Sequence, residues 1–253
     1  MSPPCPASLG GAALRLGSGE VRTPGLSFAV QQSLADVHPD IAAIHRLTRA
    51  PLTFDFAPRG GAGSGSDWAG LLGGEAGALA PYNAQATLHS EGALWGMLLP
   101  VTVHGRVSDI WRSYIAQTLM GQYGLALVFT RSLVNQERSP HNYLRDFQSE
   151  LPLYLRAGGL LDFLRAWAPS APNLSLPAQY EELLVALYEH GVLEAPDVRL
   201  AQAWLTDLAE AGYAFPTRAT HGLAAAWEKA NAANAPQLPQ EGGKPGEAGV
   251  GVV

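Results

Sequence analysis

Asp109 combines the side chain and the setting best suited to chemistry in this chain. It lies between Arg106 and Arg112, two residues before Trp111. A carboxylate in such a setting orients or deprotonates a hydroxyl, and an indole face stacks on the ring that bears the hydroxyl. The alternative interpretation is structural, with Asp109 as a helix cap or ion-pair partner, Trp111 in the core and both arginines as surface partners.

Two amides and one histidine extend this candidate site. Asn83 and Gln85 lie upstream of Asp109, and an amide both donates and accepts hydrogen bonds, as a hydroxyl-rich ligand requires. Buried amides satisfy the backbone groups of a loop equally well. His141 lies in the segment 138–143, which follows an apolar run, and a loop histidine is either a ligand contact or a solvent-exposed side chain.

The common signatures of nucleotide, cofactor and hydrolase sites are missing. The sequence has no GxGxxG, P-loop, HExxH or GxSxG motif, and it has no Asp-x-Asp triplet. Cys5 is the only cysteine, which excludes an internal disulfide and a multi-thiolate zinc site. The candidate site therefore depends on a constellation of residues and not on a motif.

The composition is that of a globular chain with few charges. Apolar residues make up 47% of the 253 residues, charged residues make up 15%, and the formal net charge is −6. The absence of a Lys/Arg cluster argues against a nucleic acid or a membrane surface as the partner. The longest apolar stretch, 93–103, is shorter than a membrane span, and the first residues do not have the pattern of a secretory signal.

Strands and helices alternate around the candidate residues, which predicts an α/β fold. The pattern predicts a strand or helix at 27–34, a helix at 40–49 capped by Asp40, strands at 51–57, 101–103 and 125–129, and a short buried helix at 91–100. Ser108 is the expected cap of the next helix, with Asp109 in its first turn. Asp109 is therefore expected just after a strand.

The remaining segments predict helices toward the end of the chain and disordered segments at both termini. Pro152 and Gly158-Gly159 divide 143–167 into two expected helices. The expected organisation is a disordered segment at 1–24, a main domain at 25–168 with a flexible insertion at 58–80, a helical hairpin at 177–215, and a mostly disordered tail at 216–253.

Three blocks carry a resemblance to a known family. PYNAQATL, ALWGMLLPVTVHGRVSDIWRSYIAQTL and IAAIHRLTR resemble, in order and spacing, the STELLO family of Golgi glycosyltransferase-like proteins. The resemblance covers roughly residues 26 to 167. HGRVSDIWRSY is also similar, more distantly, to a segment of the reversibly glycosylated polypeptides. Both relatives imply a partial GT-A-like mixed sheet with flanking helices, followed here by the helical hairpin.

The resemblance also implies roles for the candidate residues. Asp109 matches an acidic residue that serves as the catalytic base or as the partner of the acceptor hydroxyl. His141 matches a histidine that completes metal or diphosphate binding. The substrate-binding residues that the resemblance and the side-chain types suggest are Asn83, Gln85, Arg106, Trp111, Arg112 and His141.

The missing Asp-x-Asp triplet implies that this chain is the later half of such a domain and is inactive alone. The full-length parent is then expected to transfer sugar from a nucleotide sugar to a glycan acceptor in the Golgi, with Mn²⁺ or Mg²⁺ bound outside this chain. No cofactor or metal is expected in the chain itself. The alternative is a non-catalytic interaction module that assists the assembly of polysaccharide-synthase proteins.

Overall fold

A four-stranded mixed sheet forms the centre of the molecule. The computed structural model describes residues 13–16, 19–22, 27–50, 53–55, 70–72 and 79–219. The strand order is β4-β6-β3-β5. β3 (Ser27–Val37) runs parallel to β6 (Leu125–Gln136), while β4 (Gly70–Leu72) and β5 (Thr87–His89) pair antiparallel with β6 and β3 respectively. The mixed α/β sheet expected from the sequence is confirmed.

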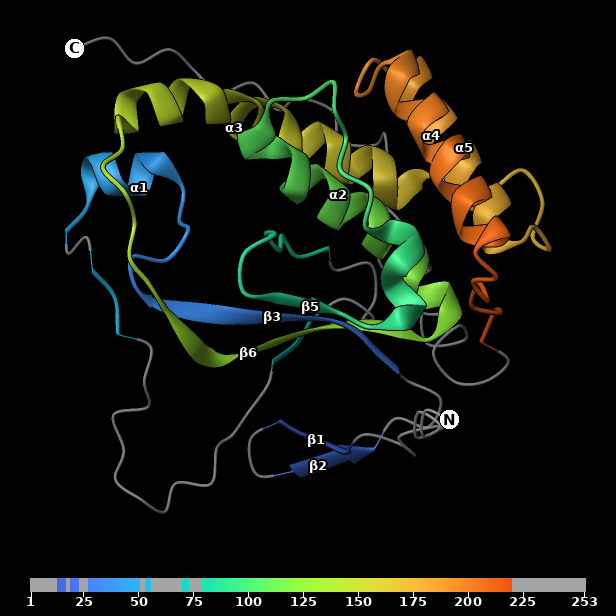
Figure 1. Ribbon diagram of the computed structural model, residues 1–253, viewed down its shortest axis with the longest axis horizontal. Helices are drawn as coiled ribbons and strands as arrows, with labels where there is room; N and C mark the ends of the chain where they lie inside the picture. Colours follow the sequence, from blue (N-terminus) through green and yellow to red (C-terminus); the bar gives the residue numbers. More distant parts are fainter. Residues whose placement is uncertain are drawn as a thin grey trace, which may run out of the picture.

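The helices lie over one face of this sheet (Figure 1). They are α1 (Ala43–Thr48), the 3-10 helix η1 (Glu91–Gly96), α2 (Gly105–Met120), the 3-10 helix η2 (Gly121–Tyr123), α3 (Tyr143–Ala166), α4 (Leu176–Glu189) and α5 (Ala195–Glu210). α2 is the central helix, because twelve of its sixteen residues, from Val107 to Met120, are buried. η1 packs closely on it: a Cβ at Gly96 would lie 3.1 Å from the Ala116 Cβ.

The start of α2 differs from the prediction. Val101–Val103 form no strand, because the Asp197 carboxylate accepts the backbone N–H groups of Val101 (2.6 Å) and Thr102 (3.3 Å). α2 then begins at Gly105, where the N-cap His104 accepts a hydrogen bond from the backbone N–H of residue 106. The expected Ser108 cap is wrong, and Asp109 lies in the second turn of α2 and not just after a strand.

The predicted division of 143–167 into two helices is also wrong. α3 is one continuous helix that contains Pro152. Contacts on both sides of the proline hold it in place: Glu150 is buried before it, and Leu160 and Leu164 are buried after it. The Gly158-Gly159 pair faces open space, so no neighbouring element forces the helix to break there.

The helical hairpin of α4 and α5 shares its core with the rest of the fold. The Trp95 ring packs edge-on against Tyr180, with ring centroids 5.4 Å apart. The Trp204 indole donates to the Trp95 carbonyl (3.2 Å). Gly191 and Gly212 adopt φ of +69° and +78° just after the two helices, the left-handed conformation that glycine adopts most readily. The hairpin is therefore joined to η1 by side-chain contacts as well as by the chain.

Several predicted segments lie wholly or partly outside the described residues. In the expected strand 51–57, only 53–55 are described, and Phe54 forms an isolated bridge with Val37. The expected insertion contributes β4. In the expected disordered start, Ala13–Leu16 (β1) and Gly19–Arg22 (β2) pair antiparallel. The rest of these segments, and the tail from residue 220, lie outside the described part of the chain.

Candidate functional site

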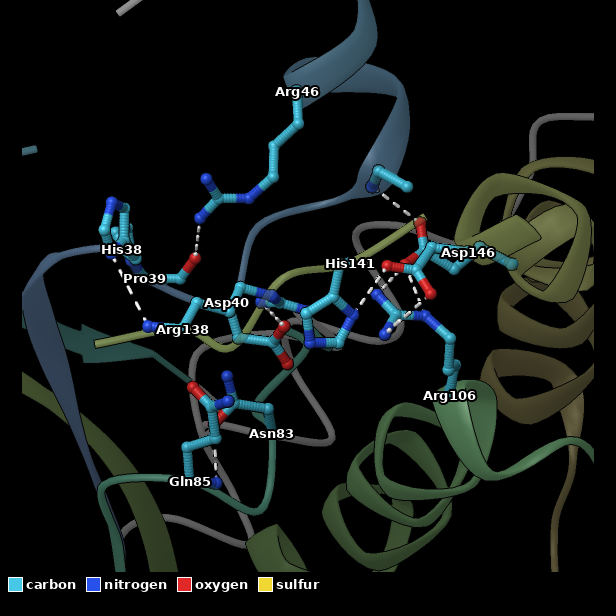
Figure 2. Close-up of polar contacts among 12 residues, drawn as sticks. His38, Pro39, Asp40, Arg46, Asn83, Gln85, Arg106, Arg138, His141 and Asp146 are labelled. Atoms are coloured by element: carbon cyan, nitrogen blue, oxygen red, sulfur yellow. Dashed lines mark hydrogen bonds and ion pairs between the residues drawn. The ribbon is translucent and has the colours of Figure 1, made fainter. Parts of the chain in front are cut away.

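A cleft of about 690 Å³ lies where the parallel strands β3 and β6 end at the same edge of the sheet. Ligands of open α/β sheets bind at the carboxyl ends of the strands. The cleft is lined by five of the seven predicted site residues: Asn83, Gln85, Arg106, Asp109 and His141. Figure 2 shows four of them, with Asn83 and Gln85 on one side and Arg106 and His141 on the other.

Asp109 reaches the cleft from α2 and also anchors a neighbouring loop. One of its carboxylate oxygens accepts the backbone N–H of Ala84 (3.1 Å), and the other accepts that of Ile110 (2.9 Å). Burial raises the pKa of Asp109 above its ordinary value, although the two backbone hydrogen bonds act in the opposite direction. Asp109 is therefore a partly buried carboxylate whose oxygens retain lone pairs for a ligand.

Gln32, which was not predicted from the sequence, fixes the loop that carries Asn83. This buried amide on β3 accepts the Asn83 N–H (2.9 Å) and the Thr87 hydroxyl (3.0 Å), and it donates to the Ser33 carbonyl (2.9 Å). The Asn83 side-chain oxygen in turn accepts the Gln85 N–H (3.0 Å). The Asn83 oxygen is thus used within the loop, as the structural interpretation of this amide proposed.

Arg106 links α2 to α3. Its Nε and Nη2 donate to Oε1 of the buried Glu150 (3.0 and 2.5 Å), and its Nη1 lies 3.5 Å from Asp146. Asp146 also contacts His141 Nδ1 (3.1 Å). The other Glu150 oxygen accepts the Ala43 N–H (2.7 Å). Glu150 therefore holds the starts of α1 and α2 against α3 at the rim of the cleft.

The charges that line the cleft are mostly negative. The loop after β3 supplies Asp40, and the loop after β6 supplies Arg138, which pairs with it at 2.7 Å. The predicted cap of α1 by Asp40 is not formed. The lining carboxylates are Asp40, Asp109, Glu137 and Glu150, and the lining guanidinium groups are Arg106 and Arg138. This balance favours a neutral polar ligand over a diphosphate.

Trp111 and Arg112 do not line the cleft. Trp111 is buried in the core, in agreement with the structural interpretation. Arg112 is also buried, with its guanidinium 4.9 Å from the Tyr82 ring centroid and its Nη1 3.2 Å from His89 Nε2. Trp111 follows Asp109 by two positions and so lies on another face of α2, whereas the Arg112 guanidinium is held by His89 and Tyr82.

The contact between Arg112 and His89 predicts a loss of stability in acid. Burial, assisted by the Arg112 charge, lowers the pKa of His89 to about 4, whereas an imidazole in an unfolded chain titrates near 6.5. The unfolded state therefore binds more protons between these values, and stability falls as pH is lowered from about 6.5 to about 4. Urea denaturation from pH 7.5 to 4 measures this slope.

Two matched variants test whether His89 causes this pH dependence of stability. We expect His89→Gln to flatten the pH dependence in this window and His190→Gln, at an exposed position, to retain it. An unchanged slope in His89→Gln would contradict the assignment.

The described residues hold neither a metal-binding cluster nor a membrane-spanning helix. They contain no group of three or more His, Cys, Asp or Glu side chains arranged to hold a metal ion. They also contain no helix that is both long and apolar enough to cross a membrane.

Comparison with known proteins identifies the family. A family model described as STELLO glycosyltransferases matches residues 106–234. Among curated proteins, the chain is 28% identical over 190 residues to "Probable glycosyltransferase STELLO2" and 28% identical over 187 residues to "Probable glycosyltransferase STELLO1", both of Arabidopsis thaliana. Each match covers 74% of this chain and 23% of the relative, so the chain spans about a quarter of their length. The chain belongs to the family of STELLO glycosyltransferases.

Proposed function

We propose that the cleft is the acceptor side of a GT-A-like glycosyltransferase site that uses a nucleotide sugar as donor. The observation that carries this proposal is the gathering of Asp109, Asn83 and Gln85 around one cleft at the carboxyl ends of two parallel strands. In this function Asp109 is a catalytic residue that accepts a hydrogen bond from the acceptor hydroxyl and orients its oxygen toward the sugar to be transferred.

The charge of the cleft supports the acceptor assignment. Arg106 and Arg138 are the cations in the lining, and each already pairs with a carboxylate. A neutral glycan needs hydrogen-bonding groups and no positive charge, whereas a diphosphate needs free cations or backbone N–H groups. The donor side is therefore assigned to the longer parent protein.

The metal ion, the cellular location and the partners are likewise assigned to the parent protein. The carboxylates of this cleft do not fit a metal site, because two of the four, Asp40 and Glu150, are paired with arginines, and the described residues contain no group of three or more His, Cys, Asp or Glu arranged to hold a metal ion. Mn²⁺ or Mg²⁺ on the donor diphosphate is assigned to other residues of the parent. By family membership, we place the parent in the Golgi, with a glycan acceptor in polysaccharide or glycoconjugate synthesis.

Sugar binding to this chain tests the proposal. We expect methyl glucoside, a small neutral acceptor analogue, to shift the backbone amide NMR signals of Asn83, Gln85 and Ala84. Amides of α5, such as that of Asp207, serve as an internal reference. UDP-glucose at the same concentration is expected to cause smaller shifts. Larger shifts with UDP-glucose would contradict the acceptor assignment, and no response to either ligand would contradict a sugar site in this cleft.

A further inference from the structure

A histidine and a carboxylate form a dyad on the cleft wall, on the side away from Asn83 and Gln85 (Figure 2). His141 Nδ1 lies 3.1 Å from Asp146 Oδ2. His141 lines the cleft and its side chain is 30% exposed, whereas the Asp146 side chain is 14% exposed. The carboxylate is thus the more buried partner, and the imidazole is the one that a ligand can reach.

The local fold holds both side chains in place. Asn142, next to His141, caps α3 by accepting the Arg145 N–H (3.1 Å), and the Asn142 carbonyl accepts the Asp146 N–H (2.9 Å). Asp146 is also fixed from α2, because its other oxygen lies 3.5 Å from Arg106 Nη1. Asp146 is therefore oriented by its backbone and by an arginine that Glu150 fixes in turn.

This geometry determines which ring nitrogen carries the proton. An ionised carboxylate accepts hydrogen bonds and donates none, so the neutral imidazole must donate from Nδ1. Its lone pair is then on Nε2. Among the described residues, no protein group forms a hydrogen bond with His141 Nε2. The dyad leaves a basic nitrogen available to a ligand in the cleft.

The charges around the dyad disfavour diphosphate binding. The charged groups around His141 are Asp146, Arg106 and Glu150 on one side and the Asp40–Arg138 pair on the other. The carboxylates of this group outnumber the guanidinium groups. They would repel a diphosphate.

We propose that His141, positioned by Asp146, is the proton acceptor for the acceptor hydroxyl, an inference that rests on the proposed function of the cleft. The hydroxyl O–H bond breaks and its proton passes to His141 Nε2. The oxygen forms a bond to the anomeric carbon of the nucleotide sugar, and the bond from that carbon to the diphosphate oxygen breaks with its electron pair on the departing nucleoside diphosphate. After the products leave, Nε2 returns the proton to water.

Asp109 and His141 have different roles in this scheme. Asp109 uses both oxygens to accept backbone N–H groups, so it is fixed and suited to hold the hydroxyl. His141 has an unoccupied lone pair and a buried carboxylate behind it, the arrangement by which a carboxylate keeps a histidine base in the correct tautomer. This proposal gives His141 the role of a base, in place of the metal or diphosphate contact that the resemblance implies.

Nitrogen NMR of the imidazole rings tests the dyad in the chain as it exists. In the chain labelled with ¹⁵N-histidine, we expect the neutral His141 ring to show a protonated Nδ1 and a bare Nε2. Asp146→Asn should abolish this preference, because an amide can also donate to Nδ1. Asp162→Asn, on the same helix with its side chain 81% exposed, should leave the tautomer unchanged. A protonated Nε2 in the wild type, or no effect of Asp146→Asn, would overturn the proposal.

Adding methyl glucoside separates this inference from the proposed function. If both are right, the backbone amide signals of Asn83 and Gln85 shift and the His141 Nε2 signal shifts with them. Amide shifts without an Nε2 response would overturn the base assignment and retain the sugar site. Without amide shifts, the proposed function itself fails.

Steady-state kinetics provide a second test of His141 as the base. In a protein that joins this chain to a donor-binding segment, His141→Gln should lower kcat by about 10²- to 10⁴-fold with little change in the acceptor KM, because glutamine is polar but cannot take a proton. A kcat within threefold of wild type would overturn the role of His141 as base.

Discussion

Asp109→Asn is expected to weaken the binding of a neutral sugar acceptor by about 10- to 100-fold, since a hydrogen bond to a charged group contributes about 1.5–3 kcal/mol. The amide places an N–H₂ group where Asp109 now accepts the Ala84 or Ile110 N–H, so the loop shifts and the charged acceptor is lost. Titration calorimetry or NMR with methyl glucoside measures the change in affinity.

The stability of Asp109→Asn should change much less than its affinity. Burial raises the pKa of Asp109, which means that the charged carboxylate is less favourable in the folded state than in the unfolded state. Removal of the charge therefore offsets the loss of one backbone hydrogen bond, and we expect a net change within about 1 kcal/mol. Asp207→Asn, exposed on α5, is the matched control. Wild-type affinity in Asp109→Asn would remove Asp109 from the site.

Glu150→Ala is expected to lower the free energy of unfolding by about 3–5 kcal/mol, the cost of breaking a buried ion pair by removing one partner. Glu150 is buried and accepts hydrogen bonds from Arg106, the Ala43 N–H and the Tyr154 hydroxyl (2.7 Å). Its loss leaves the partly buried guanidinium without its main partner. Urea denaturation at pH 7 measures this change.

Two further variants separate charge from packing at Glu150. Glu150→Gln retains the volume and one acceptor oxygen, so its loss should be smaller than that of Glu150→Ala. Glu189→Ala, at an exposed position near the end of α4, should change stability by less than about 0.5 kcal/mol. A loss below about 1 kcal/mol in Glu150→Ala would show that the ion pair is not a main support of the cleft.

Five of the seven candidate residues line the cleft, whereas the residues that support them were not predicted. Arg106 and Asp109 lie three residues apart on α2 and therefore share one face of the helix, which a periodic pattern reveals. The partners of these residues come from distant parts of the chain. Glu150 lies 44 positions from Arg106, and Gln32 lies 51 positions from Asn83. A single sequence carries no signal for such pairs, because each partner is an ordinary polar residue in its own segment.

The errors in the predicted fold also come from contacts between distant parts of the chain. The alternation in Val101–Val103 is typical of a strand, but a carboxylate 96 positions away binds the Val101 N–H instead. Pro152 is a local signal for a break, and contacts on both sides of the proline override it. The helix ends at Gly191 and Gly212, by contrast, depend on a local backbone conformation that glycine adopts readily.

The pairing of β3 with β6 also dictates the order of events during synthesis. The contact from the Leu133 N–H to the Ser33 hydroxyl joins residues 100 positions apart. At roughly 5–20 residues per second, the ribosome needs about 5–20 s to make the intervening chain. Throughout that time β3, with its apolar Ala29 and Val30, lacks its parallel neighbour. Closure of this long loop should limit the folding rate, and β3 is the segment that a chaperone would have to shield from aggregation.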